Sequence, residues 1–290
     1  MSKKILITGG AGQVGSSLYS FLEKTYNVTN TSRKGSESSI KLDISDRSEV
    51  VRVLNEYSPD VIINCASFNN VDNCEKDKRI ARNVILEGLK NLALNSGKES
   101  MIVHISSDYV FNGKKAKYSE LDQPDPLNYY GRLKLESENF LRGLNRKSVI
   151  LRCNVVFSEI LKNKSNFFAW IYNNLKDGKE INVVGDQISN PTPVELLIKT
   201  IESAIILKAN GIFNVGTLEP LSRYDFALKV CDIFNFNKDL LGKIESEDLK
   251  QIARRPMNTF LDTEKISKFL DIDVYSLDYY LEKIRDKFDE

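Results

Sequence analysis

The sequence is poor in histidine, and it lacks the residue groupings on which two classes of hydrolase depend. His104 is the single histidine among 290 residues. No group of histidine, cysteine and carboxylate residues has the spacing of a metal site, so we expect no metal and no metal-dependent hydrolase. No GxSxG sequence is present, which disfavours an esterase. Because His104 lies inside a strand-like run, we expect it to be packed in the core.

An excess of charge of one sign is also missing. Lys and Arg total 41 and Asp and Glu total 40, which leaves a formal net charge of +1. Such a balance gives no general attraction to nucleic acid or to an anionic membrane, so neither is expected as a partner. Any site for an anion must therefore be local.

Long apolar runs and paired cysteines are absent too. The N-terminus, MSKKILITGG, has an apolar run too short for a signal-peptide core, and no later run reaches membrane-spanning length. Cys65, Cys74, Cys153 and Cys231 are widely spaced and form no CxxC pair, which is typical of reduced core thiols. These features favour a cytoplasmic protein.

What the chain does contain is the composition and alternation of a globular α/β protein. Hydrophobic residues make up 41% and charged residues 28%. Short β-branched runs alternate with helix-period segments at 13–25, 45–57, 75–96 and 128–142. The runs at 61–65, 101–105 and 149–152 are almost wholly apolar, as in strands buried on both faces. The alternation predicts a Rossmann-type, doubly wound parallel sheet.

The length predicts a second, smaller lobe, because 290 residues exceed the usual size of one domain. The regular alternation ends after Phe157, where a polar stretch begins. Later helices are expected at 166–177, 194–208, 222–234, 263–270 and 276–287, and a further sheet strand at 211–216. We therefore predict a dinucleotide-binding domain over 1–157, to which the chain returns at about 192–234, and a C-terminal substrate lobe from 158–191 and 235–290.

A glycine-rich turn follows the first predicted strand and opens the first predicted helix. Gly9 permits a tight turn, Gly12 lets the backbone approach a pyrophosphate, and Gly15 allows close packing of helix on strand. Gln13 and Val14 begin the helix, whose N-terminus attracts phosphate. A plain structural turn is the alternative, but the strand before the glycines and the helix after them favour a dinucleotide site.

The end of the second predicted strand indicates which dinucleotide is bound. An NAD site usually carries Asp or Glu there, whereas this chain has Arg33 and Lys34. Two cations suit a 2′-phosphate, so we expect NADPH, with NADH as the alternative. The competing interpretation is that both side chains are solvated loop charges.

A tyrosine and a lysine four residues apart suggest hydride-transfer chemistry. Tyr130 and Lys134 share one helix face, where the ammonium group can lower the pKa of the phenol towards a value useful for proton transfer. Two other Tyr-Lys pairs, at 172/176 and 279/283, have the same spacing. Position selects Tyr130, because Ser107 ends the preceding predicted strand and can donate to a developing alkoxide.

With TGGAGQVG, Ser107 and the YxxxK pair, the chain resembles the extended short-chain dehydrogenase/reductase family over nearly its full length. The segments GQVG, HISSDYVFNG, LNYYGRLKLESE, GDQISNPTPVELL and RRPMNTFLDT occur in the order of the signature series of dTDP-4-dehydrorhamnose reductases. The resemblance implies NADPH-dependent reduction of the 4-keto group of a nucleotide-linked 6-deoxy-hexose, such as dTDP-4-dehydro-L-rhamnose or a close relative. It also implies a homodimer.

The resemblance assigns roles residue by residue. The catalytic group is Ser107, Tyr130 and Lys134, of which the last two also touch the cofactor. The implied substrate-binding residues are Asp108, Tyr109, Asn154 and Arg255. The implied neighbours of the cofactor, besides the glycine turn and the Arg33-Lys34 pair, are Asp43 and Ile44 beside the adenine and Cys65, Ala66 and Ser67 along the nicotinamide side. Asn83 is implied to support the site, and Cys65 and Ala66 could instead be small core residues.

Two departures from the family pattern concern the sugar pocket, and two alternative functions stay open beside the reductase. The segment from Arg152 to Phe157 lacks the tryptophan that many reductases of this group carry, and the segment from Ser67 to Val71 differs from the usual alanine-and-tyrosine pattern. One alternative is a non-catalytic, cofactor-binding regulatory subunit resembling that of methionine adenosyltransferase. Another is a different nucleotide-sugar reductase or an epimerase.

Overall fold

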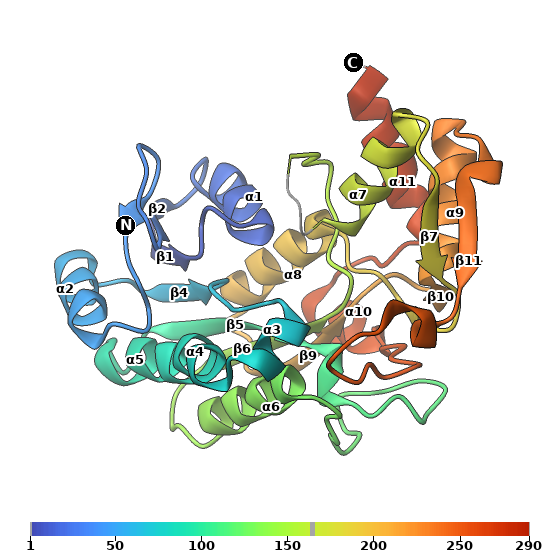
Figure 1. Cartoon of the computed structure of the whole chain (residues 1–290). Helices are drawn as coiled ribbons and strands as arrows, with labels where there is room; N and C mark the ends of the chain where they lie inside the picture. Colours follow the sequence, from blue (N-terminus) through green and yellow to red (C-terminus); the bar gives the residue numbers. More distant parts are fainter. Residues whose placement is uncertain (1, 163–165, 290) are drawn as a thin grey trace.

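The computed structural model describes residues 2–162 and 166–289. Its larger lobe is built on a seven-stranded sheet with the order β3-β2-β1-β4-β5-β6-β9, in which every pairing is parallel (Figure 1). The strands are β1 (Lys4–Thr8), β2 (Asn27–Ser32), β3 (Ile40–Lys41), β4 (Val61–Asn64), β5 (Met101–Ser107), β6 (Ser148–Cys153) and β9 (Gly211–Val215). The predicted Rossmann-type fold class is confirmed.

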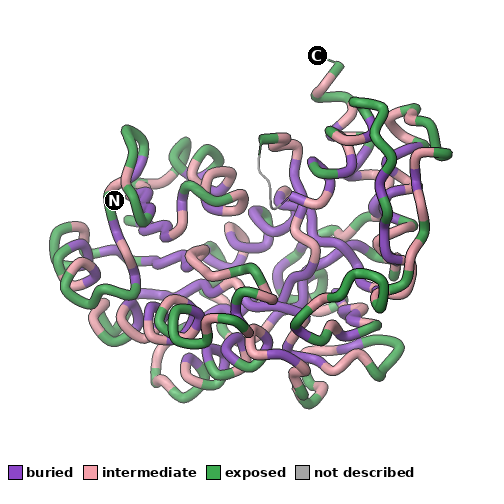
Figure 2. The backbone as a smooth tube through the Cα atoms, in the orientation of Figure 1, coloured by how far each residue is buried: buried purple, intermediate pink, exposed green. Residues whose placement is uncertain are grey.

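Alternate residues of each central strand face opposite layers of helices, as the period of a strand requires. In β1, Ile5 and Ile7 pack with Leu18 of α1, whereas Leu6 packs with Val50 of α2. One layer contains α1 (Gln13–Leu22) and α8 (Val194–Ile206), and the other contains α2 (Arg47–Tyr57), α5 (Gly88–Asn95) and α6 (Tyr129–Arg142). The central strands β4, β5 and β6 are consequently buried along almost their whole length (Figure 2).

The smaller lobe gathers α7, α9, α11 and the pair β7 and β11 at one side of the sheet (Figure 1). Phe168, Tyr172, Phe234 and Phe288 form an aromatic cluster in its core. The same hydrophobic cluster continues into α1 and α8, so the two lobes share one apolar core. The elements are α7 (Phe167–Lys176), β7 (Ile181–Val184), α9 (Arg223–Phe234), β11 (Leu241–Ile244) and α11 (Leu277–Asp289).

The predicted domain boundaries at 157, 191 and 234 stay predictions, and two helices bear on them. α9 lies inside the expected return at 192–234, yet it packs against α7, α11 and β7 of the smaller lobe. α10 (Glu264–Leu270) lies inside the expected lobe at 235–290, yet it packs beside β9 and α8. The chain therefore crosses between the lobes more often than its sequence pattern indicates.

The single helix expected at 75–96 is wrong, because that stretch is broken. Asp77 has φ −127° and ψ 75°, outside the helical region, and its side chain accepts a hydrogen bond from the backbone N–H of Ile80 at 3.0 Å. A π-helical turn then precedes Gly88, which packs against the side chain of Ile44. The pieces are α3 (Val71–Lys76), α4 (Lys78–Arg82), the π turn η1 (Asn83–Glu87) and α5.

Several short elements carry no periodic pattern and were not predicted. A strand of two residues is too short to alternate, and β11, with the sequence LGKI, has one β-branched residue. The unpredicted elements are β3, β8 (Ile188–Ser189), β10 (Leu221–Ser222), β11, and the 3₁₀ turns η2 (Asp108–Val110), η3 (Lys238–Leu240) and η4 (Ser246–Leu249). Among residues 2–162 and 166–289, no helix is long and apolar enough to cross a membrane.

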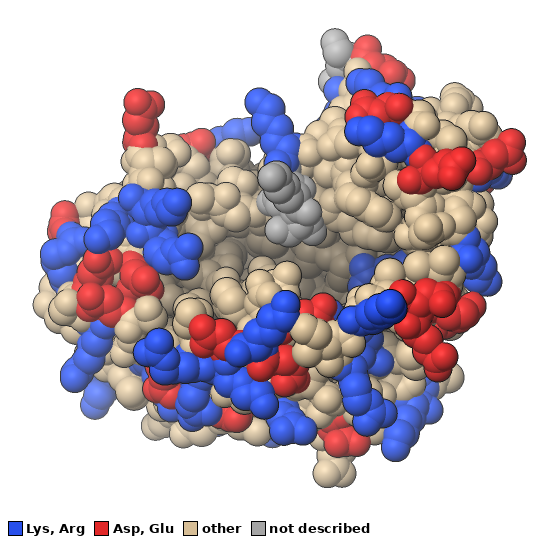
Figure 3. Space-filling view, viewed as in Figure 1, with Lys and Arg blue, Asp and Glu red and all other residues tan. Residues whose placement is uncertain are grey.

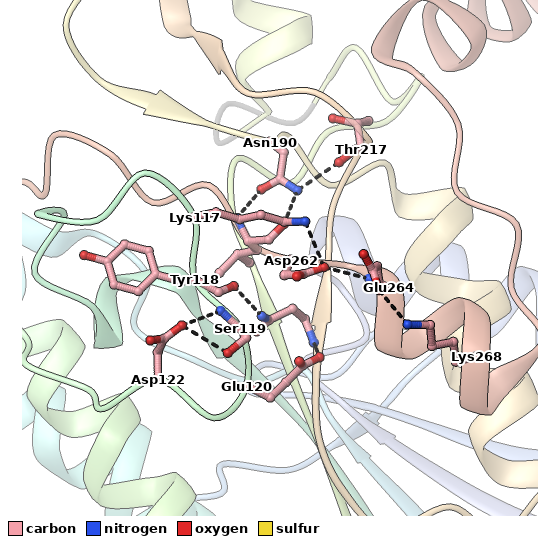
Figure 4. A network of polar contacts seen from close by, with 12 residues as sticks. Lys117, Tyr118, Ser119, Glu120, Asp122, Asn190, Thr217, Asp262, Glu264 and Lys268 are labelled. Atoms are coloured by element: carbon pink, nitrogen blue, oxygen red, sulfur yellow. Dashed lines mark hydrogen bonds and ion pairs between the residues drawn. The ribbon is translucent and has the colours of Figure 1, made fainter.

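A segment near the C-terminus, residues 253–262, runs across both lobes and is here called the crossing segment. The buried side chain of Asn190 accepts a hydrogen bond from the backbone N–H of Leu261 at 2.9 Å and donates to the carbonyls of Leu261 and Thr217 (Figure 4). Lys117 pairs with Asp262 at 3.1 Å in the same network. The path of this segment is therefore fixed by hydrogen bonds at both its sides.

A buried ion pair joins α6 to the sheet. Glu138 and Arg152, with side chains 1% and 2% exposed, form two hydrogen bonds of 3.0 and 2.7 Å. The hydroxyl of Ser106 donates to the same carboxylate at 2.6 Å, and the guanidinium lies 4.9 Å from the ring centroid of Phe111. Because a buried charge is costly without its partner, this pair makes the position of α6 strongly dependent on both residues.

We predict that Glu138→Gln lowers the free energy of unfolding by about 3–5 kcal/mol, because it leaves the Arg152 charge buried and unpaired. Glu136→Gln is the matched control on the same helix. Glu136 pairs with Arg82 at 2.9 Å on the surface, so its loss should cost less than about 1 kcal/mol. Urea unfolding followed by circular dichroism measures both. Equal losses in the two variants would contradict the role assigned to the buried pair.

Candidate active site

A cleft of about 760 Å³ opens at the carboxyl ends of β1, β4, β5 and β6. In a doubly wound sheet this edge, beside the point where the strand order reverses, is the ligand-binding edge, and here the reversal falls between β1 and β4. The hollow in the middle of the visible face is mostly uncharged, with basic and acidic side chains around its rim (Figure 3).

The glycine turn forms one wall of the cleft, with Gly9, Gly12, Gln13, Val14 and Gly15 all in the lining. Gly9 has φ +68°, which favours glycine, and an added Cβ there would lie 2.7 Å from the backbone nitrogen of Ala66. An added Cβ on Gly15 would lie 2.5 Å from the carbonyl oxygen of Gly9. The first turn of α1 has no side-chain cap, so its N–H groups face the cleft ready for an anion.

Cys65, Ala66 and Ser67, which directly follow β4, line the cleft beside the glycine turn. A buried chain of hydrogen bonds holds this strand end. Thr8 donates to Asn64 at 2.7 Å, and the amide of Asn64 lies 3.2 Å from Nδ1 of His104. Burial keeps the pKa of His104 well below its usual value, so the ring is neutral. The expectation that His104 is packed is confirmed.

Four residues expected at the cofactor do not line the cleft: Arg33, Lys34, Asp43 and Ile44. Arg33 and Lys34 are exposed just beyond β2, whose Thr31 accepts a hydrogen bond from the N–H of Gly10 at 2.8 Å in the glycine turn. Ile44 is buried in the core under α5. The carboxylate of Asp43 accepts hydrogen bonds from Ser45.

The three residues expected to be catalytic, Ser107, Tyr130 and Lys134, all line the cleft. The ammonium nitrogen of Lys134 lies 5.6 Å from the ring centroid of Tyr130 and donates to the carbonyl of Ile105 at 2.8 Å. Burial lowers the pKa of Lys134 to about 8. The expected lowering of the Tyr130 pKa is wrong for this structure, since burial, with the nearby Cys153 and Asp108, raises it.

The start of α6 is fixed so that Tyr130 faces the end of β5. Asn128 caps the helix by accepting a hydrogen bond from the N–H of Gly131 at 2.8 Å, and it donates to the carbonyl of Arg254 in the crossing segment. Gly131 lies so close to Tyr109 that an added Cβ would overlap its carbonyl oxygen. The rings of Tyr109 and Tyr130 meet edge to face with centroids 6.1 Å apart.

The four residues implied to bind substrate lie in two different cavities. Asp108, Tyr109 and Asn154 line the main cleft. Asp108 is only 3% exposed, and Asn154 donates to Asn190 at 3.2 Å while its own side-chain oxygen has no partner among the described residues. Arg255 lies instead in an adjoining cavity of about 460 Å³, where it pairs with Asp72 at 3.0 Å.

Sequence reasoning missed residues that line this second cavity. Arg223, the first residue of α9, lines both cavities, and its guanidinium lies 5.2 Å from the ring centroid of Phe167. Phe167 stacks on Trp170 with centroids 5.8 Å apart. The sequence marks the start of α9 by a Ser222-Asp225 capping box, but nothing local indicates that it opens at the cleft.

Two further expectations concern support and metal binding. Asn83 is exposed on the π turn and lines neither cavity, so its implied support of the site is not what the structure shows. In the part of the chain that the structure describes, no three metal-ligating side chains converge. Cys65 and Cys153 line the cleft, but burial raises the pKa of each thiol to about 12, which disfavours a nucleophilic role.

Comparisons with known proteins agree with the geometry. A family model described as the RmlD substrate binding domain matches residues 3–289. A dTDP-4-dehydrorhamnose reductase of Aggregatibacter actinomycetemcomitans is 34% identical over 97% of this chain and 98% of its own. The solved structure of a dTDP-4-dehydrorhamnose reductase from Bacillus anthracis strain Ames, in complex with NADP, has a TM-score of 0.90 and 29% identity, covering 99% of this chain and 100% of its own.

The chain is also similar to proteins that are not named as reductases. The methionine adenosyltransferase 2 subunit beta of Xenopus laevis is 28% identical, over 92% of this chain and 82% of its own. The family match spans nearly all of the chain, and the motif series from the glycine turn to the crossing segment lies within it. The chain therefore belongs to the RmlD substrate binding domain family, the dTDP-4-dehydrorhamnose reductase-like branch of the extended short-chain dehydrogenases/reductases.

Proposed function

We propose that the protein uses NADPH to reduce the 4-keto group of a nucleotide-linked 6-deoxy-hexose, dTDP-4-dehydro-L-rhamnose or a close relative. Its class, an NAD(P)H-dependent oxidoreductase, follows from the family. The observation that carries the proposal is the convergence of Ser107, Tyr130 and Lys134 with the glycine turn in one cleft.

The cleft has features that fit a dinucleotide. The uncapped start of α1 and the close approach at Gly9 and Gly15 leave a backbone cradle for a pyrophosphate. The hydroxyl of Ser67 is buried and has no partner among the described residues, so it suits a polar group of a ligand. Arg33 and Lys34 directly follow β2, whose Thr31 is bonded to the glycine turn, and a 2′-phosphate bound beyond that strand end would meet them.

The chemistry of the reduction divides between the cofactor and this chain. NADPH supplies the hydride. Ser107 donates a hydrogen bond to the carbonyl oxygen as charge develops on it, and Tyr130 transfers its proton to that oxygen. Lys134, charged below its pKa of about 8, stabilises the phenolate that Tyr130 then becomes.

The second cavity supports a nucleotide-linked substrate rather than a free sugar. Arg223 and Arg255 provide two cations, and Phe167 and Trp170 provide aromatic surface. Guanidinium groups suit a diphosphate and aromatic rings suit a base. Because Tyr109 and Arg223 line both cavities, a sugar at Tyr130 and a nucleotide in the second cavity can belong to one molecule.

Two other functions follow from the similarities. A regulatory subunit like methionine adenosyltransferase 2 subunit beta would bind NADPH and a partner protein without turnover. An epimerase would use the same cleft with no net consumption of NADPH. The complete Ser-Tyr-Lys group favours turnover over a regulatory role, and product analysis by NMR distinguishes an epimerase, which keeps the same three residues, from a reductase. Homodimerisation and a cytoplasmic location stay predictions.

We predict that Tyr130→Phe lowers kcat by about a hundredfold or more, because the proton donor is lost while the ring remains. NADPH oxidation with dTDP-4-dehydro-L-rhamnose, followed by absorbance, measures turnover, and fluorescence titration checks that NADPH still binds. Tyr172→Phe is the matched control, since Tyr172 has the same spacing to a lysine but packs in the aromatic core. Wild-type protein that binds NADPH tightly and turns nothing over would instead favour the regulatory subunit.

We predict that Arg33→Ala with Lys34→Ala weakens NADPH binding by roughly ten- to hundredfold and leaves NADH binding nearly unchanged, since charge-assisted hydrogen bonds to the 2′-phosphate are lost. Dissociation constants for both dinucleotides provide the measurement. Lys98→Ala, at an exposed turn before β5 and so at the other end of the sheet, is the control. A parallel weakening of NADPH and NADH would show that the pair does not select the phosphate.

A further inference from the structure

Asp108 is held by two hydroxyl groups that come from distant parts of the chain. Its Oδ1 accepts a hydrogen bond from Ser107 at 2.9 Å, and its Oδ2 accepts one from Thr259 of the crossing segment at 2.5 Å. The side chain is 3% exposed and Thr259 is 2% exposed. A carboxylate with both oxygens engaged inside the protein is poorly placed to be a simple sugar ligand, the role implied by the sequence.

The hydrogen-bond inventory of Ser107 makes this contact important. A serine hydroxyl has one proton to donate and two lone pairs with which to accept. One lone pair already accepts the backbone N–H of Tyr109 at 3.2 Å. When Asp108 is ionised it can only accept, so Ser107 must direct its single proton at Asp108. In that state Ser107 has no proton left for a substrate oxygen in the cleft.

Adding a proton to Asp108 reverses the direction of its hydrogen bond with Ser107 and keeps its hydrogen bond with Thr259. A protonated Oδ1 donates to Ser107, and Oδ2 still accepts from Thr259. Ser107 then accepts from Asp108 and from Tyr109, which fills both lone pairs and frees its proton for the cleft. The contacts of Asp108 with Ser107 and Thr259, and of Ser107 with the N–H of Tyr109, are kept in either state, and only the direction of the Ser107–Asp108 bond differs.

We propose that Asp108 is a positioning residue whose own proton decides whether the Ser107 hydroxyl can donate to the oxygen of the substrate. This inference rests on the proposed reduction, in which Ser107 stabilises the developing alkoxide. The protonated form of Asp108 is the productive form. Thr259 holds the carboxyl group so that one oxygen always faces Ser107.

The surroundings of Asp108 allow both protonation states. Burial raises its pKa to about 6, against the lowering effect of the hydrogen bonds from Thr259 and Ser107 and the charge of Arg223. Besides Arg223 on α9, the titratable groups of the described residues that interact with it include Tyr109 on η2, Tyr130 on α6 and Cys153 on β6. Bound diphosphates add negative charge and exclude water, and both effects move this pKa upward.

The backbone around Thr259 is fixed well enough to act as an anchor. The N–H of Thr259 donates to the carbonyl of Ile188 at 2.9 Å, and the N–H of Ile188 donates to Met257 at 2.8 Å. Two residues later, Leu261 is held by the side chain of Asn190 through two hydrogen bonds. Thr259 therefore cannot follow Asp108 if that side chain turns, and the contact fixes the carboxyl group in place.

We predict the following pH dependence of kcat for NADPH-dependent reduction. In the wild type, kcat falls as pH rises through a limb at or above pH 6, where Asp108 loses its proton, and falls again near pH 8, where Lys134 does. Asp108→Asn imitates the protonated acid, since its amide donates to Ser107 and its oxygen accepts from Thr259. This variant should lose the first limb and keep the second. One pH unit above the midpoint of that limb, its kcat should exceed that of the wild type by about tenfold.

A second variant tests the anchor. Thr259→Val removes a hydrogen bond that lowers the pKa of Asp108, so the first limb should move to higher pH while KM for NADPH stays the same. Thr200→Val is the matched control, because Thr200 is equally buried but bonds only within α8. It should leave the limb where it is. Thermal unfolding and NADPH binding establish that each variant is folded.

The outcomes separate this inference from the proposed function. If Asp108→Asn is folded and binds NADPH but has lost turnover, or if its first limb persists, the inference is overturned while the reductase assignment stands. If the wild type reduces no sugar nucleotide, the proposed function has failed. The inference is then decided by ¹³C-carboxyl NMR of aspartate-labelled protein, where an equal Asp108 pKa in the wild type and in Thr259→Val would overturn it.

Discussion

The contact of α6 with β5 is the constraint on which the rest of the site depends. Two successive turns of the helix are attached to consecutive residues of the strand, Lys134 through the carbonyl of Ile105 and Glu138 through the hydroxyl of Ser106. The buried bond of Glu138 to Arg152 extends the attachment to β6. Since Tyr130 lies one turn before Lys134, these polar contacts set its height above the sheet and its distance from Ser107.

A second set of contacts joins this rigid centre to the far end of the chain. The crossing segment reaches the cap of α6 through Arg254, the side chain of Asp108 through Thr259, and α3 through the pair of Arg255 with Asp72. The site is therefore assembled from the sheet, from one helix and from the crossing segment. The crossing segment has no regular secondary structure, and hydrogen bonds to buried amide groups such as that of Asn190 determine its path.

The sequence predicts the parts of this arrangement that local rules determine. Strand alternation gave the sheet, glycine spacing gave the phosphate turn, and the position of Ser107 at a strand end singled out Tyr130 from two other tyrosines with the same spacing. Contacts over long separations were not predictable. Nothing near Asp108 indicates that Thr259, 151 residues later, holds it, and nothing near Arg223 places it at the cleft. Asn83 was expected to support the site and instead is exposed, because a π turn alters which residues of that helical stretch face inward.

Because Thr259 lies close to the C-terminus, it affects how the site forms while the chain is synthesised on the ribosome. The strands from β1 to β6 and the helices α1 to α6 are complete by residue 153, so most of the large lobe can fold while the rest is still being translated. Asp108, however, stays without its second hydroxyl until the crossing segment has emerged. A chain interrupted before that point could already hold a dinucleotide on its glycine turn, yet it would lack the contact that orients the hydroxyl of Ser107.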